Sequence, residues 1–71
     1  MTNPEPELFW DSTYAIVVAL MDHFPSLSPV NIGLEELFGL VESLPGFQDD
    51  PDLVNEQLLI DILTVWYEEA T

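Results

Sequence analysis

Apolar residues recur at helical spacing in three stretches of this chain, with proline-containing connections between them. The first stretch follows Asp11 and Ser12, whose side-chain oxygens can accept hydrogen bonds from the free amides at a helix start. It stops at Pro25, which lacks the amide needed to continue a helix. The β-branched run 16–18 would also suit a strand, but the start signal and the length favour a helix from Thr13. Its expected core stripe consists of Ile16, Ala19, Leu20 and His23, widened by Val17 and Phe24.

A second helix is expected over about residues 34–44. The Ser-Pro pair at 28–29 is an earlier start signal, but Gly33 interrupts the pattern, so only a short turn or extended link is expected there. Gly39 lies inside the expected helix and costs up to about 1 kcal/mol relative to alanine, which suggests a close approach by another element. The expected buried stripe consists of Leu37, Leu40, Val41 and Leu44.

The last stretch has the widest apolar surface and is therefore expected to be a central packing helix. A turn-rich connection over residues 45–51 precedes it and carries Phe47 as an apolar anchor. Asp50 is placed to cap the helix, Pro51 falls in its first turn, and the helix is expected to run to near Glu69. Its apolar positions are Leu53, Leu58, Leu59, Ile62, Leu63, Val65 and Trp66.

Three helices with short connections predict a small all-α domain that packs in the helix-turn-helix or winged-helix style. This single domain is expected to cover residues 9–71. Residues 1–8 contain prolines and glutamates with little to pack, and are expected to form a flexible lead-in.

Charge changes this picture, because the chain has 14 aspartates and glutamates, no lysine or arginine, and a formal net charge of -14. Only His23 can form a side-chain salt bridge, so each carboxylate must be solvated, cap a helix or be neutralised from outside. Anionic lipid and nucleic acid would repel such a chain, so neither is an expected partner. The apolar run 15–21 is too short to span a bilayer and no basic signal region precedes it, so a cytoplasmic protein is expected.

Asp49, Asp50, Asp52 and Glu56 form the densest group of carboxylates. If the last helix has begun by Asp52, then Asp52 and Glu56 share one face of it. Such hard oxygen ligands suit ferrous iron, manganese, magnesium or calcium, and a surface cluster of this kind should bind weakly. The competing interpretation is that these residues only cap the helix and favour its dipole.

Glu68 and Glu69 lie at the carboxyl end of the last helix, where negative charge is unfavourable unless a cationic partner completes the site. The alternative interpretation is that these two glutamates, like Glu42 and the pair at 35–36, are only solvated surface residues. A lone histidine at a helix end, such as His23, is typical of a dipole-satisfying residue rather than a ligand.

Three aromatic residues are candidate interface anchors: Trp10, Trp66 and Tyr67. Trp66 fits the buried stripe and is expected in the core, whereas Tyr67 lies off that stripe and is the better interface candidate. No cysteine is present, and no serine stands in a nucleophile setting, so no catalytic residues and no enzymatic activity are expected.

Several short motifs together resemble the IscX family of small acidic proteins of bacterial iron–sulfur cluster assembly. The resemblance covers residues 10–70 and consists of a W-x-D-S-like start, an F-P turn, an F-x-D-D-P loop, an N-E pair opening the last helix and a V-W-x-x-E-A end. In this chain these motifs are Phe9-Trp10-Asp11-Ser12, Phe24-Pro25, Phe47-Gln48-Asp49-Asp50-Pro51, Asn55-Glu56 and Val65-Trp66-Tyr67-Glu68-Glu69-Ala70.

The resemblance implies a winged-helix-like all-α fold that does not bind DNA. It also implies weak iron (Fe2+) binding by surface carboxylates and docking on the pathway's cysteine desulfurase, in competition with the bacterial frataxin. The resemblance further implies scaffold or ferredoxin-linked components of the same pathway as partners. The chain departs from the family in lacking all basic residues and in having few acids on the first helix, which gives the loop before the last helix more weight.

The leading hypothesis is therefore a monomeric, IscX-like acidic adaptor. Its expected desulfurase contacts are Asp49, Asp50, Asp52, Tyr67, Glu68 and Glu69, and its expected weak iron ligands are Asp49, Asp50, Asp52 and Glu56. An alternative is a nucleic-acid mimic that blocks a DNA- or RNA-binding protein, which would need carboxylates spaced along one face. A third is an iron store without a protein partner, which would need tight metal binding.

Overall fold

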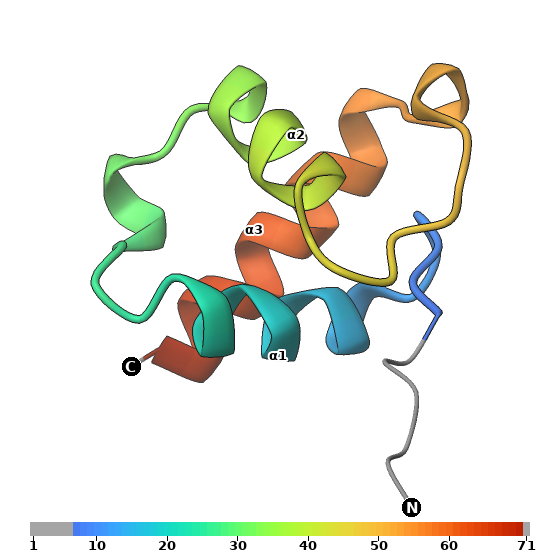
Figure 1. The fold of residues 1–71 in the computed structure, drawn as a ribbon. Helices are drawn as coiled ribbons and strands as arrows, with labels where there is room; N and C mark the ends of the chain where they lie inside the picture. The colour runs from blue at the N-terminus through green and yellow to red at the C-terminus, as the bar shows by residue number, and fades with distance from the viewer. Residues whose placement is uncertain (1–6, 71) are drawn as a thin grey trace, which may run out of the picture.

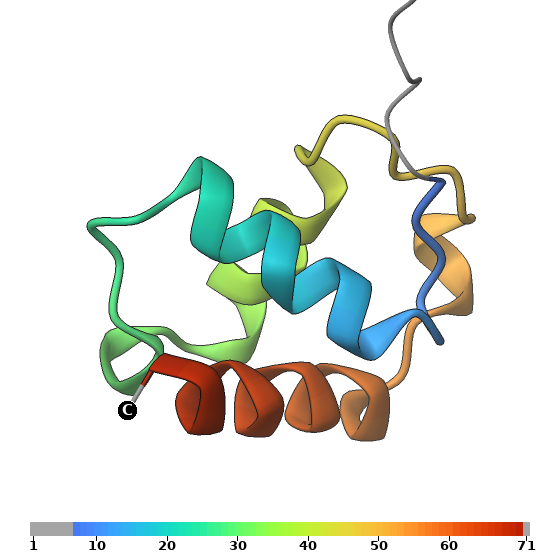
Figure 2. The same ribbon diagram turned by 90° about the horizontal axis from the view of Figure 1, so that it is seen from below.

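The computed structural model describes residues 7–70, which form three α-helices. α1 and α3 lie side by side, and α2 packs across both (Figure 1, Figure 2). Within the described residues there is no strand, only an isolated bridge between Leu8 and Phe47, so the prediction of an all-α protein is confirmed. The elements are α1 (Thr13–His23), a 3₁₀ turn η1 (Pro29–Asn31), α2 (Leu34–Glu42), a 3₁₀ turn η2 (Pro51–Leu53) and α3 (Glu56–Ala70).

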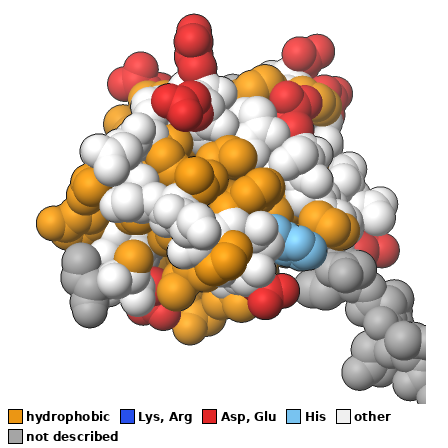
Figure 3. Space-filling view, turned by 60° about the vertical axis from the view of Figure 1, so that its left-hand side comes forward, with side chains coloured by type: hydrophobic (Ala, Val, Ile, Leu, Met, Phe, Trp, Pro, Cys, Tyr) orange, Lys and Arg blue, Asp and Glu red, His pale blue; other side chains and the backbone are white. Residues whose placement is uncertain are grey.

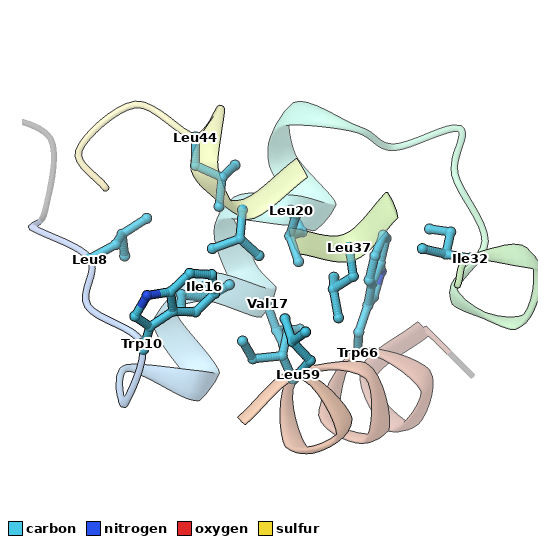
Figure 4. Close-up of a cluster of buried hydrophobic side chains, with 12 residues drawn as sticks. Leu8, Trp10, Ile16, Val17, Leu20, Ile32, Leu37, Leu44, Leu59 and Trp66 are labelled. Atoms are coloured by element: carbon cyan, nitrogen blue, oxygen red, sulfur yellow. The ribbon is translucent and has the colours of Figure 1, made fainter. Parts of the chain in front are cut away.

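One hydrophobic core joins the three helices to the segment that precedes α1 (Figure 4). Trp10 and Trp66 fill opposite ends of this core, and both are almost fully buried. The burial of Trp66 confirms its assignment to the core stripe. The other buried apolar side chains are Leu8, Ile16, Val17, Leu20, Ile32, Leu37, Val41, Leu44, Leu59 and Ile62.

The ends of the first two helices follow the local signals with small differences. Ser12 is the N-cap of α1, but its side chain makes no capping hydrogen bond; the amide of Ile16 donates to its carbonyl instead. His23 was expected on the core stripe, yet it is exposed. α2 ends at Glu42, two residues before the expected end, and Leu44 still packs into the core from the following turn.

The expected close approach at Gly39 is wrong. No heavy atom of a neighbouring element lies within 4 Å of the position that a Cβ atom would occupy there. Gly39 lies on the exposed side of α2, so its lack of a side chain does not serve packing.

The lead-in also differs from expectation at its last residue. Residues 1–6 lie outside the described part of the chain, but Leu8 is only 1% exposed. Its amide donates to the carbonyl of Gly46 at 2.8 Å, and its carbonyl accepts from the amide of Gln48 at 2.9 Å. Gly46 has a φ of 88°, a left-handed conformation that glycine adopts without strain, and this bends the chain into the bridge with Leu8. The first segment is therefore fixed to the connection between α2 and α3.

Candidate functional site

The aspartates of the acidic loop, which we define as residues 49–52, are held in place by Trp10. The backbone amide of Trp10 donates to Oδ2 of Asp49 at 3.0 Å, and its indole Nε1 donates to the carbonyl of Asp50 at 2.9 Å. The indole also stacks on Phe38, with ring centroids 5.8 Å apart, and forms a T-shaped pair with Phe47, with ring centroids 4.8 Å apart. Core packing therefore sets the position of a loop rich in carboxylates.

Two aspartates of the acidic loop bond to its own backbone. Oδ1 of Asp49 accepts from the amide of Asp50 at 2.8 Å, so both oxygens of this carboxylate are used. Oδ1 of Asp50 accepts from the amide of Asp52 at 2.9 Å and caps η2. These bonds support the interpretation that Asp49 and Asp50 are structural residues, as the sequence alternative proposed.

The last helix begins later than predicted. Pro51 opens only the short turn η2, and α3 starts at Glu56, where Oδ1 of Asn55 accepts from the amide of Leu58 at 2.8 Å. The assumption that Asp52 and Glu56 share a helical face is therefore wrong, because an extended link separates η2 from α3. The Asn-Glu pair of the family motif does open the helix. Leu53, expected in the core, is 63% exposed for the same reason.

The expected metal ligands differ in how exposed their carboxylates are and in how many hydrogen bonds those carboxylates already accept. The carboxylate of Asp49 is partly buried and each of its oxygens accepts from a backbone amide, whereas Asp50, Asp52 and Glu56 are exposed. Over residues 7–70, no group of three or more Asp, Glu or His side chains is arranged to hold a metal ion.

The second expected contact group, Tyr67, Glu68 and Glu69, lies in the last turns of α3, and all three residues are exposed. Tyr67 is half-exposed, as expected for an interface candidate. The acidic loop lies just before the other end of α3, so the structure does not bring the two groups together (Figure 1). At 1.5 Å per residue, the helix separates them by about 20 Å.

The remaining candidates are solvated side chains. Glu35, Glu36 and Glu42 lie at the two ends of α2 and are exposed. On the side of the molecule that faces left in Figure 1, apolar side chains occupy the middle of the surface and carboxylates gather towards its margins (Figure 3). By their positions in the described chain, most carboxylates lie near helix ends or in loops, and Asp61 in the middle of α3 is an exception.

Replacing Asp49 by alanine should lower the free energy of unfolding by about 1–3 kcal/mol, because two backbone amides lose their acceptor. The change also relieves charge repulsion, so Asp52→Ala is the matched control. It removes the same charge, and within residues 7–70 no hydrogen bond to its carboxylate is seen. Urea unfolding at one fixed ionic strength measures both variants. Equal stability of the two variants would show that the Asp49 bonds do not stabilise the fold.

The role of Trp10 was left open by the sequence, which offered it only as a candidate interface anchor. Its partners lie 39 and 40 residues away along the chain, beyond the reach of local patterns. The structure shows that Leu8 and Trp10 are buried while Phe9 between them is exposed, but the sequence did not signal this, because all three residues are apolar and show no alternation.

Comparison with known proteins indicates the family to which the chain belongs. A family model described as iron–sulphur cluster assembly matches residues 8–71, which begin at the buried Leu8 and include the acidic loop and all three helices. An uncharacterized protein of Pseudomonas aeruginosa is 32% identical over 62 residues, covering 87% of this chain and 94% of that protein. The chain therefore belongs to the iron–sulphur cluster assembly family, and its general role lies in that process.

Proposed function

We propose that this protein is a non-enzymatic, IscX-like modulator that docks on a basic surface of a cysteine desulfurase and holds ferrous iron weakly. Membership of the family supports a role in iron–sulphur cluster assembly, and the net charge of -14 supports a partner with a cationic surface. A winged-helix-like arrangement of the three helices, without DNA binding, is part of this proposal.

The observation that carries the proposal is the attachment of the acidic loop to the core through Trp10. A loop already held in one conformation loses less entropy when a partner binds, so its exposed carboxylates are more effective contacts than mobile ones. Asp52 and Glu56 are the loop-side residues best placed for this role, because no hydrogen bond to either side chain is seen within residues 7–70.

Ferrous iron enters the proposal as weakly held cargo. Asp52, Glu56 and the second oxygen of Asp50 each offer a hard oxygen ligand. Because no three such side chains in residues 7–70 are arranged around one ion, one or two of them would hold it and water would supply the rest of the shell. Asp49 is the least suited of the four expected ligands, because an ion would compete with two backbone amides for its oxygens. The nucleic-acid mimic receives no support from the gathering of carboxylates at helix ends.

The double variant Asp52→Asn/Glu56→Gln should weaken desulfurase binding about fivefold to thirtyfold, since each of the two lost charge pairs at an interface is worth about 0.5–1 kcal/mol. Neither substitution removes an acceptor that the fold uses, unlike changes at Asp49 or Asp50. Titration calorimetry at physiological ionic strength is the measurement, because a Debye length of about 8 Å screens remote charges there.

The matched control is Glu36→Gln/Glu42→Gln, which removes equal charge from exposed positions on α2. It should change the affinity less than twofold. An equal loss from both double variants would mean that only net charge matters and that the acidic loop is not the contact. Absence of any binding by the unaltered protein would reject the desulfurase as the partner.

A further inference from the structure

An apolar groove lies between the first turns of α2 and α3, next to the acidic loop. Its apolar surface comes from side chains on both helices and on the link before α3, and carboxylates stand on its rim at Glu35 and Glu56. The apolar side chains that line it are Leu34, Phe38, Val54 and Leu59. All but Leu59 are partly exposed, so the groove presents apolar surface to solvent.

The groove is preformed rather than dependent on a partner. Phe38 is stacked against the buried indole of Trp10 at 5.8 Å, and Asn55 fixes the first turn of α3 through its bond to the amide of Leu58. The carboxylates of Glu35 and Glu56 are exposed, and neither is bonded to another side chain within residues 7–70. A preformed apolar groove with unengaged acidic groups on its rim is suited to a ligand that is apolar in the middle and cationic at its edges.

Charge decides between the occupants that such a groove could take. A second copy would bring another -14 to the interface, and this chain has no lysine or arginine to meet the rim. The residues of this chain before the described part, 1–6, contain a glutamate and no lysine or arginine, so the rim disfavours them as well. Anionic lipids are repelled for the same reason.

We propose that this groove receives one or two apolar side chains from a protein segment in which lysines or arginines flank them. This inference rests on the proposed function, since the segment would belong to the partner that docks on the acidic loop. Asp52 precedes Val54 by only two residues, so basic residues around an apolar anchor in the groove can reach the loop. The loop and rim then supply attraction and orientation, and the groove supplies the desolvated anchor that gives an interface most of its affinity.

The first test uses the double variant Leu34→Gln/Val54→Thr, which makes the groove polar and leaves the charge unchanged. Its affinity for the cysteine desulfurase should fall at least tenfold, with the same salt dependence as that of the unaltered protein. The matched control, Leu27→Gln/Val30→Thr, makes the same changes at exposed positions outside this groove and should alter the affinity less than twofold. Urea unfolding of both variants shows whether each remains folded.

The second test needs no variant and no desulfurase. Two peptides, Lys-Lys-Leu-Leu-Lys-Lys and Lys-Lys-Ser-Ser-Lys-Lys, are titrated into the full chain labelled with ¹⁵N. The leucine peptide should shift the amides of Leu34, Phe38 and Val54 at least threefold more than the serine peptide does. Both peptides should shift the amides of the acidic loop to a similar extent, because their charges are equal.

Equal groove shifts with the two peptides would overturn the inference, because charge alone would then explain binding. So would leucine-specific shifts at Val30 and Tyr67, which line a different groove between η1 and α3. The groove would be assigned to a second copy instead if sedimentation equilibrium showed dimers of the unaltered protein and only monomers of the groove variant. If the groove variant binds the desulfurase normally, the inference fails and the proposed function stands. If the leucine peptide enters the groove but the unaltered protein does not bind the desulfurase, the proposed function fails and the groove remains a site for such a segment.

Discussion

Replacing Trp10 by alanine should lower the free energy of unfolding by about 3–5 kcal/mol, the usual loss for a buried tryptophan. The side chain is only 2% exposed, contacts the rings of Phe38 and Phe47, and donates its indole hydrogen to the carbonyl of Asp50. A domain of this size is stable by only about 5 kcal/mol, so the variant should be partly unfolded at 37 °C. Because Trp10 also holds the acidic loop, partner binding should be lost with the fold.

Urea unfolding followed by circular dichroism measures this loss. The stability of Trp10→Phe should lie between those of the unaltered protein and Trp10→Ala. This variant keeps a stacked ring but leaves the Asp50 carbonyl without its donor, a loss of about 1 kcal/mol. Tyr14→Ala removes an aromatic side chain that is 60% exposed on α1 and should cost less than about 1 kcal/mol. A Trp10→Ala variant within 1 kcal/mol of the unaltered protein would contradict the role assigned to the indole.

The three helices and most of their buried faces could be predicted because their signals are local. Ile16, Val17 and Leu20 recur at helical spacing, and Pro25 ends the pattern within two residues of the observed end of α1. The same reasoning placed Trp66 in the core and Tyr67 on the surface, since neighbours on a helix point about 100° apart.

The start of α3 was missed because two start signals lie close together. An Asp-Pro pair can open either a 3₁₀ turn or an α-helix, and here Asp50 and Pro51 open only η2. Asn55 is the cap that α3 uses, and the exposure of Leu53 follows from the later start. Local propensity alone does not choose between such neighbouring caps, since packing decides which turn propagates.

The attachment of the acidic loop was beyond prediction for a different reason. It joins Trp10 to Asp49 and Asp50 across about half of the chain, and no spacing rule relates positions so far apart. The sequence identified the cluster of carboxylates but not which of them the fold itself uses. Asp49 is therefore better interpreted as a structural residue. Asp52 remains a predicted partner contact, and Glu56, which the sequence suggested only as an iron ligand, joins it in our proposal.

Raising the ionic strength from about 10 mM to about 1 M should increase the free energy of unfolding on the order of 3 kcal/mol. The Debye length falls from about 30 Å to about 3 Å over this range. The radius of gyration of the fold is 11.6 Å, so at low salt every carboxylate repels all the others, and at high salt only close neighbours do. With no lysine or arginine to offset this repulsion, the compact state carries more of it than the unfolded chain.

Urea midpoints in sodium chloride and in potassium chloride measure the effect, and the two salts should agree at equal ionic strength because screening depends on charge rather than on the ion. A non-ionic osmolyte at matched osmolality is the control and should not reproduce the steep rise at low concentration. A flat dependence on salt would mean that the unfolded chain retains as much repulsion as the fold. A rise of the expected size would instead show that external cations are part of the stability of this protein, so a basic partner that covers the acidic loop should stabilise the fold as it binds.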